Sequence, residues 1–295
     1  MTDTDRASEL KKRLRQGLLV GDGGMGTSLT RSGAARPGEA LEALNVDGPD
    51  AVRAAHRAFL EAGSDVLQTN TFQGNAISLG REGIAERAAE LNRAAAALAR
   101  EVAGDRAYVA GSIGPTGGIL EPYGELAEDA ARAAFEQQAA ALAEGGVDFF
   151  IVETFSAVEE AEIAVRAAAA TGLPVAASLA FDPSGRTSFG VTPQRGAEAL
   201  AAAGAEVVGA NCGTISPAEM VEIIRFFREA SSLPLIAQPN AGRPQQTPTG
   251  VSYPEGPAGM AEAAGELVAL GATIVGGCCG STAEHIRAIA ARLRG

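Results

Sequence analysis

The sequence contains no tryptophan, and aromatic residues of all kinds make up only 4% of its 295 positions. A cage for a quaternary ammonium group needs several aromatic rings, so such a cage is poorly supplied here. Cysteine is also scarce, with three residues in the whole chain. An odd, small number of cysteines argues against a disulfide framework and favours a reducing compartment, so we expect a cytoplasmic protein.

The chain also lacks any basic block and any long apolar run. Lysine and arginine total 24 against 36 aspartates and glutamates, which gives a net charge of −12. Nucleic acid and anionic membranes are therefore poor partners. No apolar stretch is long enough to span a bilayer, and the charged start of the chain lacks the apolar centre of a signal peptide. The sequence leaves the oligomeric state open.

Short apolar runs alternate with helical patterns along the chain. The runs are continuous, as is typical of parallel strands that are buried on both faces. Eight such strand–helix units predict a (β/α)8 TIM barrel, a single domain over residues 17–295, with a polar helix over residues 1–16 outside the core. An open, doubly wound sheet is the alternative. The expected strands are 18–21, 64–70, 108–113, 149–153, 175–180, 207–210, 235–238 and 273–275, and the expected helices are 49–62, 84–103, 126–144, 158–170, 193–203, 217–230, 256–270 and 283–293.

All three cysteines follow the ends of predicted strands. Cys212 follows the run 207–210, and Cys278 and Cys279 follow 273–275 and two glycines. The glycines allow the backbone to turn, so that two adjacent thiols can converge on one point. Three thiolates at one barrel rim predict a zinc site with an open fourth position, as in catalytic zinc sites. The alternatives are small buried hydrophobic residues or a strained Cys278–Cys279 disulfide.

Other polar residues also end predicted strands, and in a barrel these ends share the active-site rim. Glu153 closes an apolar run and must find a partner, whereas Asp182 in Asp-Pro-Ser-Gly has a common turn sequence. The strand-end residues are Asp22, Asn70, Ser112, Glu153, Asp182 and Asn240.

Three further expectations concern local structure. Ser281 and Glu284 have the spacing of a capping box that starts the last helix. We expect His56 and His285 to be surface or capping residues rather than ligands. Two long loops, 114–124 and 239–255, leave the active-site rim and are expected to be lids or docking surfaces.

Several segments resemble those of the homocysteine S-methyltransferases, in particular the homocysteine-binding module of cobalamin-dependent methionine synthase. The resemblance covers about Gly17 to Arg292. It is carried by Asp22-Gly23-Gly24-Met25-Gly26-Thr27, Gln68-Thr69-Asn70-Thr71-Phe72, Gly111-Ser112-Ile113-Gly114-Pro115-Thr116-Gly117, Val152-Glu153-Thr154-Phe155, Asn211-Cys212, Pro239-Asn240-Ala241-Gly242 and Gly276-Gly277-Cys278-Cys279-Gly280.

The resemblance implies a (β/α)8 barrel in which Cys212, Cys278 and Cys279 bind zinc. It implies that Asp22 and Glu153 hold the amino group of homocysteine, and that backbone N–H groups around Gly24 and Met25 receive its carboxylate. Asn70, Ser112 and Asn240 complete the expected substrate-binding set. Homocysteine bound to zinc through its thiolate would then accept a methyl group and become methionine. Without substrate, we expect the Asn240 oxygen to occupy or border the open zinc position.

The loops Gly-Pro-Thr-Gly and Pro-Asn-Ala-Gly resemble those of the cobalamin-dependent enzymes. The expected donor is therefore a methylcorrinoid, either free methylcobalamin or one on a separate corrinoid protein, because no cobalamin domain follows Gly295 in this sequence. Two alternatives stay open. One is S-methylmethionine or betaine as the donor, and the other is a non-catalytic zinc- or thiol-binding partner of a corrinoid protein.

Overall fold

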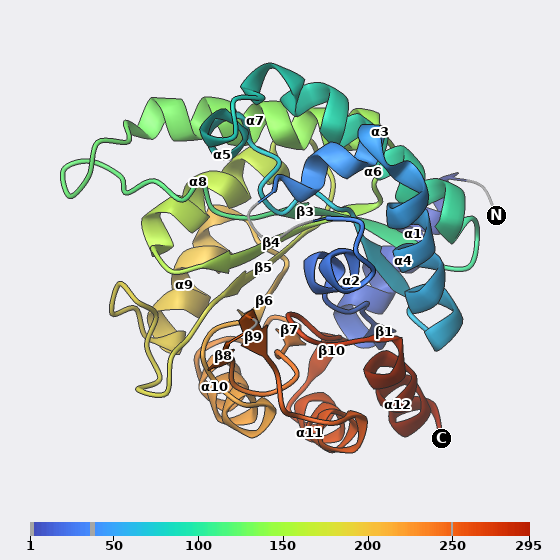
Figure 1. The fold of residues 1–295 in the computed structure, drawn as a ribbon. Helices are drawn as coiled ribbons and strands as arrows, with labels where there is room; N and C mark the ends of the chain where they lie inside the picture. Colours follow the sequence, from blue (N-terminus) through green and yellow to red (C-terminus); the bar gives the residue numbers. More distant parts are fainter. Residues whose placement is uncertain (1–2, 36–38, 249) are drawn as a thin grey trace.

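The computed structural model describes residues 3–35, 39–248 and 250–295 (Figure 1). Eight parallel strands form one sheet in the order β1-β10-β7-β6-β5-β4-β3-β2, with helices around it. This arrangement confirms the predicted (β/α)8 barrel. The strands are β1 (Leu19–Val20), β2 (Val66–Gln68), β3 (Tyr108–Ile113), β4 (Phe149–Phe155), β5 (Val175–Leu179), β6 (Val207–Asn211), β7 (Leu235–Gln238) and β10 (Ala272–Val275).

Two aspartates close the seam between β1 and β2, the two ends of the strand order. The Asp65 N–H donates to the Val20 carbonyl at 2.7 Å, and the Val20 N–H donates to the Asp65 carboxylate at 2.9 Å. Nearer the rim, the Gln68 N–H donates to Asp22 Oδ2 at 2.8 Å. Side-chain oxygens thus replace ladder acceptors where the strands diverge, and the sheet is a nearly closed barrel rather than an open sheet.

One long helix follows each strand, and the observed bounds of α4, α9 and α10 equal the predicted ones. None of the described helices is long and apolar enough to cross a membrane. The long helices are α4 (Pro49–Ala62), α6 (Ala88–Ala103), α7 (Glu128–Glu144), α8 (Val158–Ala169), α9 (Pro193–Ala203), α10 (Pro217–Ala230), α11 (Pro257–Ala269) and α12 (Ala283–Arg294).

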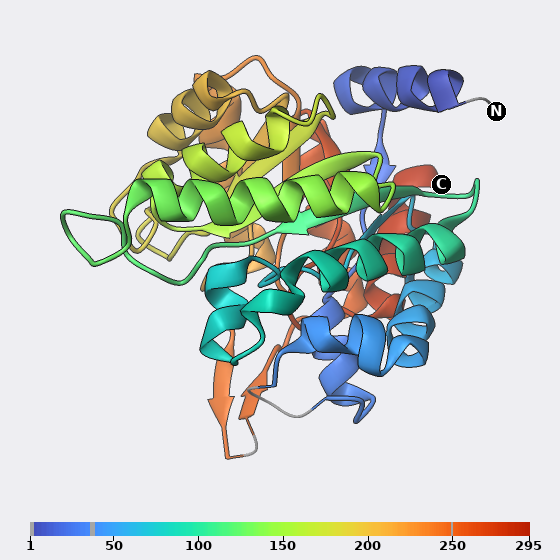
Figure 2. The same ribbon diagram turned by 90° about the horizontal axis from the view of Figure 1, so that it is seen from above.

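Short elements in the loops after β1, β2 and β7 were not predicted as separate elements, because each is too short to show a helical or strand period; η2 lies at the start of the predicted helix 84–103. A hairpin of two short strands lies within the predicted loop 239–255 and projects away from the barrel (Figure 2). The short elements are α2 (Met25–Arg31), η1 (Leu41–Ala43), α3 (Leu44–Asp47), α5 (Ala76–Arg81), η2 (Ala85–Arg87), β8 (Gln245–Thr247) and β9 (Gly250–Ser252).

The predicted capping box at the start of α12 is wrong by one residue. Thr282 is the N-cap, and its N–H and hydroxyl contact His285 Nδ1 at 3.2 and 2.9 Å. The Ser281 hydroxyl is instead used elsewhere, because it donates to the Cys278 carbonyl at 2.5 Å and accepts the Gly24 N–H at 3.1 Å. Ser281 therefore stabilises the loop that carries Cys278 and Cys279, and the N-cap of α12 is one residue later, at Thr282.

The first helix, α1 (Asp3–Gln16), is part of the core, so the prediction that it lies outside was wrong; residues 1–2 lie outside the described part. Leu10 and Leu14 are 1% and 3% exposed and join the apolar cluster inside the barrel. Arg6 anchors the helix, since its Nε donates to Asp148 Oδ1 at 2.9 Å. Helix α1 covers the end of the barrel opposite the hairpin (Figure 2). Its mostly polar sequence gave no indication that two of its leucines are buried.

The interior of the barrel changes from apolar to polar along the strands. An apolar cluster near the strand starts consists of Leu19, Val66, Ala110, Ile151, Ala176, Val207, Ile236 and Ile274, with neighbours. Because side chains alternate between the two faces of a strand, the position two residues later also faces inward. We call these positions the polar layer: Gly21, Gln68, Ser112, Glu153, Ser178, Gly209, Gln238 and Gly276.

We expect Leu14→Ala to lower the free energy of unfolding by about 2–5 kcal/mol, because it leaves a cavity in the barrel core. Urea unfolding followed by circular dichroism measures the change. Lys11→Ala on the exposed face of α1 is the control and should change stability by less than about 0.5 kcal/mol. Equal effects of the two substitutions would show that α1 is not part of the folded core.

Candidate metal centre and active site

The structure brings all three cysteines to one point at the carboxyl end of the barrel. Their sulfur atoms lie within 4.8 Å of one another, and Cys212 Sγ lies 4.0 Å from Cys279 Sγ. Sulfur ligands around a tetrahedral zinc ion, each about 2.3 Å from the metal, lie roughly 3.8 Å apart. The three thiols are free and half-buried. The donor set and its spacing therefore fit a zinc ion.

Backbone groups at the end of β7 hold both cysteine loops. The Cys212 N–H donates to the Gln238 carbonyl at 3.0 Å, and the Cys278 N–H donates to the Pro239 carbonyl at 2.8 Å. Cys212 and Gly213 have φ angles of +54° and +76°. This left-handed turn is costly for a residue with a side chain, and it reverses the chain so that the Cys212 thiol faces the other two.

Asn240 joins the two cysteine loops through its side chain. Its Nδ2 donates to the Gly213 carbonyl at 2.8 Å, and its Oδ1 accepts the Cys279 N–H at 3.0 Å. The side chain is 1% exposed. These contacts give Asn240 a structural role in the metal centre, and none of them supports its predicted contact with zinc or substrate.

Glu153 lies buried in the polar layer and accepts three hydrogen bonds. Gln68 Nε2 and the Ser112 hydroxyl donate to Oε1 at 2.9 and 2.6 Å, and Asn211 Nδ2 donates to Oε2 at 3.1 Å. Burial raises the pKa of Glu153 to about 7, although the bond from Ser112 lowers it. The predicted substrate residue Ser112 thus binds the carboxylate of Glu153.

Asp22 is a second buried carboxylate beside the same glutamine. It is 1% exposed, and its Oδ2 accepts the Gln68 N–H. Burial raises the pKa of Asp22 well above its usual value, and the charge of Glu153 raises it further. Neither carboxylate forms an ion pair with any residue of the described chain. A cation placed near both would stabilise their ionised forms.

Asn211 connects this carboxylate region to the thiols, although sequence analysis assigned it no separate role. Its Nδ2 also contacts the Thr154 hydroxyl at 2.6 Å and Cys278 Sγ at 3.8 Å. Its Oδ1 accepts the Thr154 N–H and the Ser178 hydroxyl, both at 2.8 Å. Thr154 has a φ of +66°, an outlier for a β-branched residue. Asn211 therefore holds a strained backbone position next to Glu153.

Tyr253 is a further unpredicted neighbour of the metal centre. A Cβ on Gly280 would lie 2.4 Å from the Tyr253 side chain, so only glycine lets the ring approach. Hydrogen bonds from Cys212 and Cys278, and a weaker one from Tyr253, lower the pKa of Cys279 to about 3. A lowered pKa favours the thiolate, which is the form of cysteine that binds a metal ion.

Three other predicted substrate-binding residues, Asn70, Gly24 and Met25, do not contact Glu153 or the cysteines through the bonds described above. Asn70 Nδ2 donates to the Leu41 carbonyl at 2.7 Å, so this amide faces the η1–α3 segment. The Gly24 N–H contacts the Ser281 hydroxyl at 3.1 Å and is already used. Met25 begins α2, where the first N–H groups have no partner within the helix. Of the backbone N–H groups expected to bind the substrate carboxylate, those at the start of α2 are therefore the ones that remain available.

The two histidines differ from each other. His285 caps α12, as expected, and its Nε2 contacts the Glu255 carbonyl at 3.0 Å. The expectation for His56 was wrong, because this side chain is fully buried and neither ring nitrogen has a partner among the described residues. Burial lowers the pKa of His56 to about 4, so its ring is neutral at pH 7.

Asp182 is a turn residue, as the sequence predicted, since its Oδ1 accepts the Ser184 N–H at 2.8 Å.

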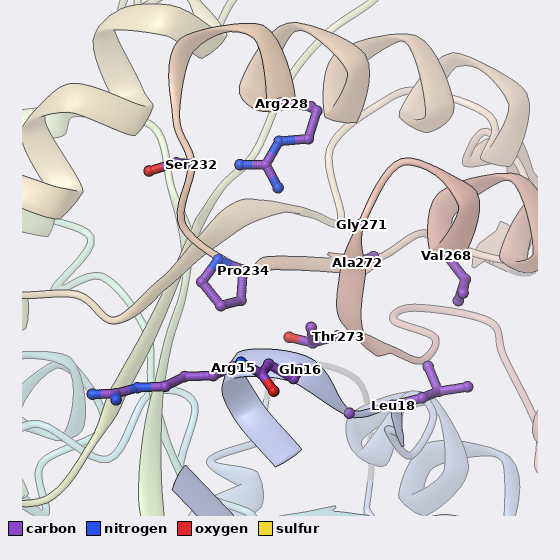
Figure 3. Close-up of a pocket in the computed structure, with 11 residues that line it drawn as sticks. Arg15, Gln16, Leu18, Arg228, Ser232, Pro234, Val268, Gly271, Ala272 and Thr273 are labelled. Carbon is purple, nitrogen blue, oxygen red and sulfur yellow. The ribbon is translucent and has the colours of Figure 1, made fainter. Parts of the chain in front are cut away.

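A cavity of about 550 Å³ lies at the opposite end of the barrel (Figure 3). It is lined by residues such as Arg15, Arg228 and Thr273, where α1, α10 and β10 meet. Arg15 and Arg228 lie in the last turns of their helices, where cations favour the helix dipole. This cavity is remote from the cysteines and explains no part of the metal centre.

Comparisons with known proteins agree with this geometry. The family profile described as homocysteine S-methyltransferase matches residues 19–293. Methionine synthase of Mycobacterium tuberculosis is 36% identical over 306 residues, covering 98% of this chain. Betaine–homocysteine S-methyltransferase 1 of Bos taurus is 38% identical over 304 residues, covering 96% of this chain and 74% of that protein. The chain spans only 25% of the length of the mycobacterial methionine synthase.

A solved structure shows the same fold. The metallated form of the homocysteine methyltransferase MmuM from Escherichia coli superposes with a TM-score of 0.80 at 24% sequence identity. The match covers 97% of this chain and 98% of that one. At this identity the likeness is one of architecture.

We expect the reduced protein to bind one zinc ion per chain, and Cys212→Ala to weaken zinc binding by more than about 100-fold. Loss of residues that only support metal ligands typically costs 10–100-fold, and loss of a ligand should cost more. Competition with a chromophoric chelator measures the affinity. Ser188→Ala, an exposed change in the β5–α9 loop, is the control. Unchanged zinc affinity in Cys212→Ala would exclude this metal centre.

Proposed function

The chain belongs to the homocysteine S-methyltransferase family, and from this membership we propose that it methylates the thiol of homocysteine to give methionine. The observation that carries the proposal is the position of three convergent thiols directly beside two buried carboxylates that have no cation. A thiol-bearing amino acid has the matching groups, because its sulfur suits a zinc site and its ammonium suits the carboxylates.

In this proposal Cys212, Cys278 and Cys279 would hold zinc. When bound, zinc lowers the pKa of a coordinated thiol and keeps the thiolate available at neutral pH. The chain's own residues orient the substrate. Glu153 and Asp22 would receive the ammonium group, and the first turn of α2 at Met25 would face the carboxylate, as the sequence resemblance implies.

The reaction is a transfer of a methyl cation between two nucleophiles. A bond forms between the homocysteine sulfur and the methyl carbon while the bond from that carbon to the donor breaks. Both electrons of the broken bond stay with the donor, and the thiol proton passes to solvent. The reaction therefore needs positioning of sulfur and methyl group more than it needs a basic side chain.

The aromatic residues support a methylcorrinoid as the donor, either free methylcobalamin or one on a separate protein. Tyr108 lies at the strand start, with the Arg6 guanidinium 4.8 Å from its ring centre. Tyr123 is 90% exposed, and Phe155 is fully buried. Of the three tyrosines, Phe72 and Phe155, which could have supplied a cage, only Phe72 and Tyr253 remain near the rim. That is a poor cage for the cation of betaine or S-methylmethionine.

Betaine is the second candidate donor, because a betaine–homocysteine S-methyltransferase is 38% identical to the chain. A non-catalytic role as a zinc- or thiol-binding partner of a corrinoid protein is a separate class of function. We place the reaction in the cytoplasm, since three reduced thiols are needed together.

We expect Glu153→Ala to weaken homocysteine binding by about 10- to 100-fold and to lower turnover while zinc remains bound. The reason is that hydrogen bonds to charged groups contribute about 1.5–3 kcal/mol. Calorimetry gives the affinity, and a zinc assay confirms the metal. Glu159→Ala, six residues away and exposed on α8, is the control. Wild-type homocysteine binding in Glu153→Ala would favour the non-catalytic class.

We expect the zinc-loaded protein to form methionine from homocysteine and methylcobalamin at least tenfold faster than from betaine or S-methylmethionine. The physical reason is the scarcity of aromatic rings at the rim. Methionine formation under matched concentrations is the measurement. Faster turnover with betaine would reverse the donor assignment, and equal failure of all three would remove its basis.

A further inference from the structure

Two glutamines of the polar layer meet across the interior of the barrel. Gln68 ends β2 and Gln238 ends β7, and β1 and β10 lie between these strands. The intervening inward positions are Gly21 and Gly276. A Cβ on Gly21 would lie 3.2 Å from the Gly276 Cα and 3.5 Å from Gln238 Nε2. The absence of side chains at these glycines therefore leaves the space in which the glutamines meet.

A chain of hydrogen bonds sets the orientation of both amides. Gln68 Nε2 donates to Glu153 Oε1, so the Gln68 oxygen faces the other way. That oxygen accepts a hydrogen bond from Gln238 Nε2. Reversal of the Gln68 amide would place its oxygen against a carboxyl oxygen that already accepts a bond, and two acceptors repel. Glu153 thus fixes the Gln68 amide, and through it the Gln238 amide, so that Gln238 Nε2 faces Gln68 and Gln238 Oε1 faces away from it.

The result is that Gln238 Oε1 is a buried acceptor with no partner in the described part of the chain. Gln238 is 2% exposed, and its Oε1 forms no hydrogen bond with any residue that the structure describes. Buried polar atoms are normally paired, so an unpaired one calls for an explanation. Asp22 and Glu153, the two unpaired carboxylates, both contact Gln68 and so lie in the same part of the interior. An ammonium group has three N–H donors and needs three acceptors.

We propose that Gln238 Oε1 is the third acceptor for the ammonium group of the substrate, beside Asp22 and Glu153. The oxygen makes the site selective for thiols that carry an α-ammonium group over thiols of the same length that lack it. A neutral acceptor also suits this position, because a third carboxylate would add repulsion between buried charges. This inference rests on the proposed function, since it takes homocysteine as the bound thiol.

The test compares homocysteine with 4-mercaptobutanoate, which is homocysteine without its amino group. Gln238→Met keeps the length of the side chain and removes the oxygen. We expect it to weaken homocysteine binding by about 10- to 100-fold, the usual loss for a hydrogen bond to a charged group. Binding of 4-mercaptobutanoate should change by less than about threefold. Gln245→Met makes the same change on the exposed strand β8 and is the control.

The same comparison in a Glu153→Gln background separates direct contact from positioning. If Gln238 touches the ammonium group, Gln238→Met lowers homocysteine affinity further in that background. No further loss there would mean that Gln238 acts only through Glu153, and the inference would be wrong. Equal loss for both thiols would also overturn it, because that pattern reports a damaged site.

Two safeguards keep the result interpretable. Gln238→Asn retains an amide but withdraws the oxygen by one carbon, and it should show the same selective loss if Gln238→Met does not fold. The wild-type protein decides the proposed function separately. If the wild type fails to bind homocysteine, the proposed function fails; if it binds homocysteine and the variants keep its full preference over 4-mercaptobutanoate, only this inference fails.

Discussion

The carboxyl end of β7 is the support on which the whole site depends. Its carbonyl groups at Gln238 and Pro239 hold the loops of Cys212 and Cys278, and the Asn240 side chain joins these loops. Thiols that lie far apart in the chain can meet here because parallel strands of a barrel end at one rim. The same strand also sends the Gln238 side chain inward. The metal centre and the interior polar groups therefore share one piece of backbone.

The interior of the barrel carries an electrostatic cost that the substrate can offset. Asp22 and Glu153 are buried without an ion-pair partner in residues 3–35, 39–248 and 250–295, and burial raises the pKa of each. Thr154 and Cys212 add backbone strain at positive φ, and Asn211 contacts Thr154 directly. Such features persist in a fold when surrounding contacts hold them in place. An ammonium group bound between the carboxylates would remove the unfavourable charge, so the stability of this region and substrate binding are linked.

Sequence reasoning succeeded where a periodic pattern or a strand end carried the information. It predicted the eight strand–helix units, the convergence of the cysteines and the need of Glu153 for partners. It failed for α1, whose Leu10 and Leu14 lie within a charged helix, and for His56, which is buried on α4. Burial of a single face depends on what packs against it, and that partner lies elsewhere in the chain. The hydrogen-bond partners of Asn70 and Asn240 were missed for the same reason, since Leu41 and Gly213 are distant in sequence.

The sequence by itself determined the barrel, the family and the three thiol ligands of a candidate metal site, because strand periodicity and strand-end residues are local properties. Only the tertiary structure decided which polar atoms remain for a ligand. Asn240 and Ser112 form hydrogen bonds within the protein, while Gln238 Oε1 has no partner among the residues that the structure describes. That outcome depends on hydrogen bonds between strands that are far apart in the chain and on the space left by Gly21 and Gly276. No local pattern encodes either.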